Sequence, residues 1–297
     1  YFWDHEMQVT PVYFFRTLDN WPFYVDYAEE IIYIDQEGNV EAYFETEEFR
    51  MAADFQRDMY VRGLRHPDIL SIPRDLKTQA NQSGRYLFGL GTGALSDYPL
   101  IVQQFPDAEL EQFYLAEGKP FYETLPVWNS NSVPSTTDQP QAGIEFLNWL
   151  YASNENHDLF LYGVPGEHYE PVGDDRMTQV RTESGQAVYA HPFWQTQYVP
   201  FANFGTDALD ALVDSYLTPM DNVENAINVG FVFDKEPVSA EWANVLAERE
   251  ASMYPIKWGV VSYEDHFDEA IARMRAAGLA TIVEEYQRQF DEWRAEQ

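Results

Sequence analysis

Three consecutive segments at the end of the chain carry apolar residues at helical spacing, and this run constrains the fold more than any other feature. They are 239–253, 262–277 and 279–295. Ser262 and Asp265 form an N-terminal cap pair for the second segment, and Gly278 separates it from the third. The sequence therefore predicts that the chain closes with a group of helices.

The first half of the chain contains shorter elements. Ile31–Ile34 and Val40–Tyr43 flank the polar segment 35–39, which predicts two strands joined by a turn. Thr46 precedes a run of apolar residues at helical spacing that ends before Gly63, so a helix capped by Thr46 is expected over 46–62. A further strand is expected at Arg85–Phe88. Strands in the first half and helices in the second predict an α/β fold.

A proline-rich connection divides the chain. Residues 120–140 include Pro126, Pro134 and the polar segment Asn129–Ser132, which favour an extended linker or hinge. Helices are expected at 143–151, 155–162 and 206–218, and a loop-rich region at 163–205. We place the domain boundary here, with an α/β region containing a hinge strand at 1–125 and the hinge, helical segment and C-terminal region at 126–297.

Charge and cysteine content exclude several functions. The 297 residues include 50 acidic and 18 basic side chains, for a formal charge of −32, so the long-range field repels nucleic acid and anionic lipid. A well-solvated surface explains this charge, and a cation-rich ligand is the alternative. The absence of cysteine excludes disulfides, thiolate metal sites and a cysteine nucleophile. The six histidines lack metal-ligand spacing, so no metal site is predicted. No cofactor is expected.

Catalytic motifs are weak in this sequence. The segment from Gly89 to Ala94 superficially matches a dinucleotide-binding turn, but Pro99 lies soon after it, in what should be the first helix, so we interpret the segment as a strand-to-loop junction. The 35–39 turn begins like a calcium loop, but its glycine is at the wrong position. No Gly-x-Ser-x-Gly nucleophile elbow is present. No catalytic residue is therefore predicted, although so many carboxylates leave a glycoside hydrolase possible.

Aromatic residues beside polar loop residues are more informative. Sugars present flat C–H faces and a rim of hydroxyls, which suit aromatic platforms flanked by amides and carboxylates. A half-buried core role is the alternative for each ring singly, but the set favours a carbohydrate site. The predicted ligand-binding residues are Trp194, Tyr198, Trp128, Asn131, Gln195, Trp3, Asp4 and Trp21.

From Gln141 onward the sequence resembles the C-terminal region of lipoprotein-type extracellular solute-binding proteins (family 1) of carbohydrate ABC importers. The helix 146–151 with the following Tyr162–Tyr169 and Val172–Arg176 is similar to the family's helix and its "YG-x-x-G-x-HY…VG" loop. Gly230–Val238 looks like the next block, and 270–293 is similar to the family's terminal helix pair. Residues 38–63 resemble, more loosely, the segment that opens the second lobe.

This resemblance implies a type II periplasmic-binding-protein fold, in which two α/β lobes close on a sugar and then dock on the membrane permease. It implies oligosaccharide and an ABC transporter permease as partners, no catalysis, and an extracellular, cell-surface location. Members begin with a lipid-anchored cysteine and a long first lobe, and the sequence has no counterpart of either. The expectation is therefore a lobe with C-terminal helices, with the first lobe largely missing and the lipoprotein anchor not in this chain.

Two alternatives remain open at this point. One is a glycoside hydrolase, which the abundance of carboxylates and aromatic rings would allow. The other is a lobe that contacts the permease or another partner without binding sugar by itself.

Overall fold

The protein is described by a computed structural model in two compact units, each of which is treated by itself. One unit comprises Tyr1–Gly93, Phe113–Pro126 and Asn222–Gln297, and the other comprises Ala94–Gln112 and Val127–Asp221. The residues that the structure describes are 2–3, 24–25, 30–35, 37–71, 86–88, 105–107, 121–123, 130–173, 176–183, 186–196, 198–206, 213 and 223–297.

The first unit contains a three-stranded antiparallel sheet. It joins β2 (Tyr24–Val25), β3 (Ile32–Ile34) and β4 (Val40–Ala42), with Ile34 opposite Val40. The carboxylate of Asp35 accepts hydrogen bonds from the backbone N–H groups of Gly38 (2.8 Å) and Asn39 (2.7 Å) and so closes the turn. The predicted hairpin is confirmed, and its turn is an Asx-type turn that local hydrogen bonds stabilise.

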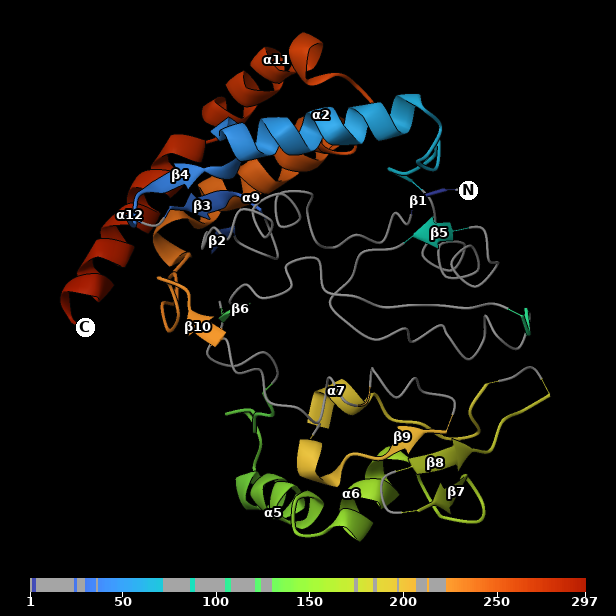
Figure 1. Cartoon of the computed structure of the whole chain (residues 1–297). Coiled ribbons are helices and arrows are strands. Elements are labelled where there is room, and N and C mark those ends of the chain that lie inside the picture. The colour runs from blue at the N-terminus through green and yellow to red at the C-terminus, as the bar shows by residue number, and fades with distance from the viewer. Residues whose placement is uncertain are drawn as a thin grey trace. The chain divides into compact units, whose positions relative to one another are not determined.

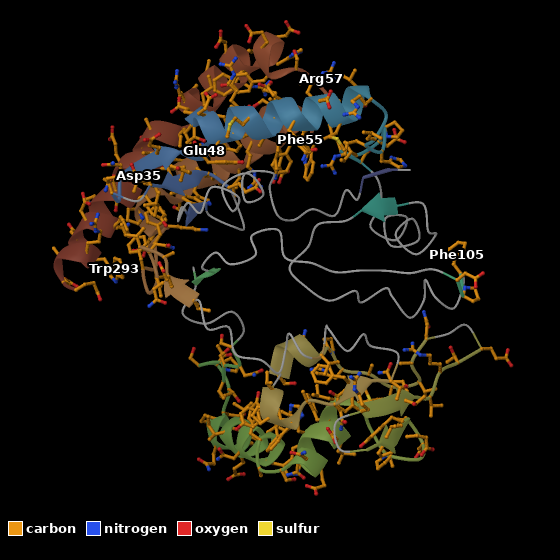
Figure 2. The ribbon with its side chains drawn as sticks, viewed as in Figure 1. Asp35, Glu48, Phe55, Arg57, Phe105 and Trp293 are labelled. Atoms are coloured by element: carbon orange, nitrogen blue, oxygen red, sulfur yellow. The ribbon has the colours of Figure 1, made fainter. Side chains whose placement is uncertain are left out.

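The helix predicted after the hairpin is also confirmed. A 3-10 turn, η1 (Tyr43–Glu45), leads into α2 (Glu47–Val61). The Thr46 hydroxyl accepts a hydrogen bond from the Phe49 N–H at 3.2 Å, which satisfies one of the free donors at the helix start. Figure 2 shows Glu48, Phe55 and Arg57 placed along this helix, and the Arg57 guanidinium donates to the Gly259 carbonyl at 2.9 Å.

The C-terminal helices are confirmed with one difference. They are α9 (Ser239–Glu248), α10 (Tyr254–Lys257), α11 (Tyr263–Ala276) and α12 (Leu279–Ala295). A π-helical turn, Arg249–Met253, joins α9 to α10, where the sequence predicted one helix ending at Met253. Pro255 has no N–H to donate and sits in the first turn of α10, so the chain changes its hydrogen-bonding pattern here. The predicted cap is present, since the Ser262 hydroxyl accepts from the Asp265 N–H.

Helix α12 covers the hairpin (Figure 1). The Gln287 side chain accepts from the Val40 N–H at 2.7 Å and donates to the Gly38 carbonyl at 3.1 Å, so it satisfies backbone groups of the hairpin. Burial of apolar side chains from the hairpin, α2 and the C-terminal helices forms a single core. Fully buried members of this core include Ile31, Ile32, Ile34, Phe44, Phe49, Val245, Met253, Ile256, Met274, Ile282 and Phe290.

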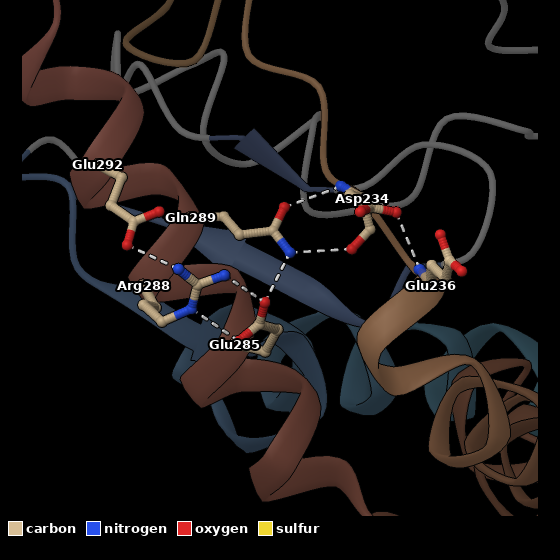
Figure 3. A network of polar contacts seen from close by, with 6 residues as sticks. All are labelled: Asp234, Glu236, Glu285, Arg288, Gln289 and Glu292. Carbon is tan, nitrogen blue, oxygen red and sulfur yellow. Dashed lines mark hydrogen bonds and ion pairs between the residues drawn. The ribbon is translucent and has the colours of Figure 1, made fainter.

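The Gly230–Val238 block packs on α12. The Phe231 ring makes edge contacts with Tyr286 and Phe290, both at a centroid distance of 5.2 Å. Figure 3 shows the polar contacts beside it: the Gln289 amide accepts from the Asp234 N–H and donates to the Asp234 carbonyl, each at 2.9 Å. The 3-10 turn η3 (Glu236–Val238) then leads into α9. This block is therefore a structural connection in the described unit.

Two further pairs of short strands belong to this unit, and both are parallel. β1 (Phe2–Trp3) pairs with β5 (Tyr86–Phe88), which confirms the strand predicted at 85–88. β6 (Phe121–Glu123) pairs with β10 (Val223–Asn225). The glycine cluster after β5 lies outside the described residues, so its interpretation stays a prediction.

The second unit combines helices and a small sheet. α5 (Pro140–Leu150) and α6 (Asn154–Leu161) confirm two predicted helices. The region predicted to be loop-rich contains a mixed sheet of β7 (Tyr169–Val172), β8 (Arg176–Gln179) and β9 (Phe204–Gly205). Between β8 and β9 the chain forms α7 (Phe193–Thr196) and the 3-10 turn η2 (Val199–Phe201). Apart from Val213, the helix predicted at 206–218 lies outside the described residues.

The observed class is mixed α/β with C-terminal helices, as expected. The two compact units are assembled from segments far apart in the chain, whereas the predicted division at residues 125 and 126 follows chain order and stays a prediction. Among the described helices, none is both long enough and apolar enough to cross a membrane.

Candidate functional site

The candidate site lies in the second unit, around the segment 195–198, and α5 and α6 frame it. Ser153 caps α6 by accepting a hydrogen bond from the Asn156 N–H at 3.3 Å. Within α6, His157 is fully buried, and Tyr151 directly follows α5 as its C-cap. Both side chains reach the Thr196 carbonyl: the Tyr151 hydroxyl donates at 3.2 Å and His157 Nε2 lies at 3.4 Å.

Four rings connect this buried frame to the surface. His157 lies 6.4 Å from Tyr151 and 5.8 Å from Phe201, measured between ring centroids. Tyr198 makes edge contacts with the same two rings, at 6.1 Å to Tyr151 and 4.7 Å to Phe201. Tyr198 as a residue is 44% exposed, so packing holds its side chain while part of the residue faces solvent.

The two predicted amide residues lie together next to this ring cluster. The Asn131 side-chain amide donates to the backbone carbonyl of Gln195 at 3.4 Å, and both residues are exposed. Gln195 and Tyr198 are three residues apart in the chain. The structure thus brings Asn131, Gln195 and Tyr198 to one region, with amide groups and a partly exposed ring available to a ligand.

The other predicted site residues are less fully described. Trp194 lies within α7, next to Gln195, and Trp3 lies in β1 of the first unit. Trp128, Asp4 and Trp21 lie outside the described residues. Their assignment to the site stays a prediction.

Sequence reasoning missed Tyr151, His157 and Phe201. Tyr151 is the last residue of the first family block, and His157 is one of six histidines without metal-ligand spacing. Their role depends on contacts with Thr196 and Tyr198, about forty residues further along the chain, so a local pattern gives no signal for it. Within the described residues no group of His, Asp or Glu side chains is arranged to hold a metal ion.

A half-buried carboxyl group supports the chain that leaves the site. The Asp158 carboxylate accepts a hydrogen bond from the Asn203 side-chain amide at 3.0 Å, and the Tyr162 hydroxyl donates to the Asn203 carbonyl at 2.9 Å. Burial raises the pKa of Asp158 to about 6, with the charge of Glu155 adding to the effect and the Asn203 amide opposing it. The fold therefore favours the protonated form of Asp158.

This environment predicts a pH-dependent stability that Asp158→Asn should remove. Because the pKa of Asp158 is higher in the folded protein than its ordinary 3.8, the stability that this group contributes is present at low pH and falls as pH rises through about 6. Asparagine imitates the neutral acid. The variant should gain about 1–2 kcal/mol of unfolding free energy near pH 7.5, after allowance for partial solvent exposure, and much less near pH 4.

Urea denaturation of the wild type and Asp158→Asn at both pH values measures this difference. Glu170→Gln, which changes an exposed carboxylate in β7 of the same unit, serves as the control and should show no comparable gain. An Asp158→Asn variant that is less stable than the wild type near pH 7.5 would contradict the assignment.

The Tyr162–Tyr169 block forms a compact turn near this network. Gly163 has a φ of +88°, and a Cβ at this position would lie 2.6 Å from His168 Nδ1. His168 Nδ1 in turn accepts a hydrogen bond from the Val164 N–H at 2.8 Å, and Tyr162 packs edge-on against Tyr169. The block therefore requires glycine and histidine for a structural reason.

Comparison with known proteins places the fold. The structure is similar to the N-glycan transport solute binding protein (NgtS) from Streptococcus pneumoniae in complex with Man1GlcNAc, with a TM-score of 0.65 and 16% identity, covering 88% of this chain and 59% of that chain. The same protein without a named ligand gives a TM-score of 0.67 at 18% identity, covering 88% and 58%. The fold expected from the sequence is confirmed.

A second solute-binding protein shares the fold more distantly. The HMO-binding ABC-transporter-associated solute binding protein from Bifidobacterium longum infantis gives a TM-score of 0.51 and 13% identity, covering 88% of this chain and 57% of that chain. The chain thus spans less than two thirds of the length of each of these solved chains. A family model described as a domain of unknown function, DUF3502, matches residues 227–295, and no curated protein matches the sequence.

Proposed function

We propose that this chain belongs to an extracellular binding protein that holds an oligosaccharide for uptake by an ABC importer, without breaking bonds in it. The observation that carries the proposal is the partly exposed Tyr198 ring, held beside Asn131 and Gln195 in a fold shared with NgtS. The solved neighbours are named as binding N-glycan fragments or HMO. Their low identity supports the class of ligand and no finer detail.

The chemistry of the site suits a neutral, hydroxyl-rich ligand. The face of a tyrosine ring packs against the C–H groups of a sugar, while amide groups can donate to and accept from its hydroxyls. The formal charge of −32 disfavours phosphorylated or sulfated ligands over long range. An uncharged oligosaccharide meets both conditions. Trp194, Trp128, Trp3 and Trp21 are proposed as further stacking residues, and Asp4 as a further orienting group.

The transport role rests on the shared fold. In a two-lobed binding protein, ligand contacts with both lobes favour the closed state, and closure then gives the transporter a conformational signal. We propose a membrane permease as the partner and an extracellular, lipid-anchored location for the protein. The description of a neighbour as ABC-transporter-associated supports this role.

Replacing Tyr198 with alanine tests the proposed site. We expect the affinity for oligosaccharide to fall roughly tenfold, because the variant loses the stacking surface but keeps the amide groups. Isothermal titration calorimetry against neutral oligosaccharides, including the Man5GlcNAc bound by one solved neighbour, measures the change. Tyr189→Ala is the matched control. Tyr189 is an exposed tyrosine of the same unit whose ring contacts His168, away from the rings around Tyr198, so the variant should bind oligosaccharide with wild-type affinity.

The alternatives give different results in the same assays. Absence of heat with every oligosaccharide would contradict sugar binding and leave a partner-interaction lobe. Chromatography of an oligosaccharide incubated with the protein detects hydrolysis, and the appearance of shorter products over time would favour the glycoside hydrolase. The proposal requires measurable binding and an unchanged oligosaccharide.

A further inference from the structure

The backbone at the candidate site is held from inside the second unit by two side chains. Thr196 is buried, yet its neighbours Gln195 and Tyr198 are exposed. Its carbonyl oxygen meets the Tyr151 hydroxyl at 3.2 Å and His157 Nε2 at 3.4 Å. One donor directly follows α5 and the other lies within α6, so the Thr196 carbonyl oxygen links the backbone here to both helices.

The hydrogen on the His157 ring can be assigned from these contacts. A backbone carbonyl only accepts hydrogen bonds, so Nε2 must carry the hydrogen in the interaction with Thr196. Burial lowers the pKa of His157, partly opposed by the Thr196 carbonyl, so the ring is neutral at neutral pH. In this tautomer Nδ1 carries no hydrogen, and it makes no hydrogen bond within the described part of the chain. Donation from Nε2 to the Thr196 carbonyl is therefore the hydrogen bond that the His157 ring makes within the described residues.

The same residues also fix the ring that faces solvent. His157 and Tyr198 each contact both Tyr151 and Phe201, so the fully buried imidazole and the partly exposed phenol share two neighbours. Moving Thr196 would move Gln195 and Tyr198 with it. The backbone–backbone hydrogen bonds that Gln195 and Tyr198 make in the described part of the chain are short-range: the Gln195 N–H donates to the Pro192 carbonyl at 3.1 Å, and the Tyr198 carbonyl accepts from the Phe201 N–H at 2.8 Å.

We propose that His157 and Tyr151 are positioning residues for ligand binding: by donating to the Thr196 carbonyl, they hold Gln195 and Tyr198 in the geometry that accepts a sugar. This inference rests on the proposed function for its ligand, but the anchoring can be measured without one. Pre-organisation of this kind improves affinity, because the free protein has already lost the freedom that binding would otherwise remove.

Three substitutions separate anchoring from simple packing. His157→Phe keeps a ring among Tyr151 and Phe201 but loses the donor. His157→Gln loses the ring but retains an amide N–H close to the position of Nε2. Tyr151→Phe removes one hydroxyl from a partly exposed ring, and it keeps the test decisive if His157→Phe does not fold.

Hydrogen–deuterium exchange of the sugar-free protein gives the first readout. Amides at 195–203 should exchange roughly fivefold faster in His157→Phe and Tyr151→Phe, and close to the wild-type rate in His157→Gln. Amides in α12, in the other unit, should keep their wild-type rates. Unchanged exchange at 195–203 in both Phe variants, or equal acceleration in all three variants and in α12, would overturn the inference.

Calorimetry with the oligosaccharide gives the second readout. Affinity should fall roughly fivefold in the two Phe variants and recover in His157→Gln. Exchange that responds as expected while the wild type binds no sugar contradicts the proposed function alone. Wild-type affinity in both Phe variants contradicts the positioning role alone.

Discussion

Replacing Lys257 with methionine is expected to lower the free energy of unfolding by roughly 3–5 kcal/mol. The Lys257 ammonium forms an ion pair with Glu30, and the two side chains are only 10% and 9% exposed. Burial lowers the pKa of Lys257, and the Glu30 carboxylate opposes that shift. Without the lysine, a carboxylate is left buried beside the core with its ionic partner removed.

Two comparisons make this prediction specific. Combining Glu30→Gln with Lys257→Met should recover much of the loss, because an uncharged pair no longer needs compensation. Arg62→Met breaks an exposed ion pair with Asp58 and should cost less than about 1 kcal/mol. Urea denaturation followed by circular dichroism measures all four proteins. A loss below about 1 kcal/mol for Lys257→Met would contradict the prediction and show that the buried Glu30 side chain does not depend on its ionic partner.

Substituting alanine for Gly259 is expected to cost about 2–5 kcal/mol, for two reasons that add. Gly259 has a φ of +71°, a conformation that residues with a Cβ rarely adopt. An alanine Cβ would also lie 2.4 Å from the backbone carbon and oxygen of Gln56 in α2. The Arg57 guanidinium donates to the Gly259 and Val260 carbonyls at 2.9 and 2.8 Å, so the close approach is maintained by hydrogen bonds.

Gly63→Ala separates the two contributions. Gly63 has nearly the same φ, +70°, but a Cβ there meets nothing within 4 Å. This variant should lose about 1–2 kcal/mol, which is the cost of the left-handed backbone alone. Differential scanning calorimetry of both variants gives the difference. Equal losses of stability in the two variants would contradict the prediction, because they would mean that the 259–260 turn moves away from α2 without cost.

Elements set by local chemistry could be predicted from the sequence. The turn at Asp35, the cap at Thr46 and the cap at Ser262 each depend on residues within four positions, so their patterns indicate the structure directly. The π-helical turn after α9 was not predicted, because the helical spacing of apolar residues does not distinguish it from a regular α-helix. Parallel pairs such as β6 with β10 join residues about a hundred positions apart, and local patterns carry no information on such partners.

The candidate site divides in the same way. Tyr198, Gln195 and Asn131 could be proposed because aromatic and amide residues in loops suit a sugar, whatever their exact neighbours. Tyr151 and His157 could not, since the sequence places them only in the predicted helices 143–151 and 155–162, and their role depends on contact with Thr196. The sequence thus indicates residues whose side chains can bind a ligand, whereas the residues that position them can be identified only from tertiary contacts.

Saturation-transfer difference NMR on the protein with a neutral oligosaccharide tests the central claim most directly. Selective irradiation of the protein should saturate the C–H protons of one sugar face, and Tyr198→Ala should remove most of that signal while Tyr189→Ala retains it. The anomeric proton signals should stay constant over the incubation, because the protein does not hydrolyse its ligand. A spectrum with no saturation transfer for any oligosaccharide, or with new anomeric signals growing over time, would contradict the account.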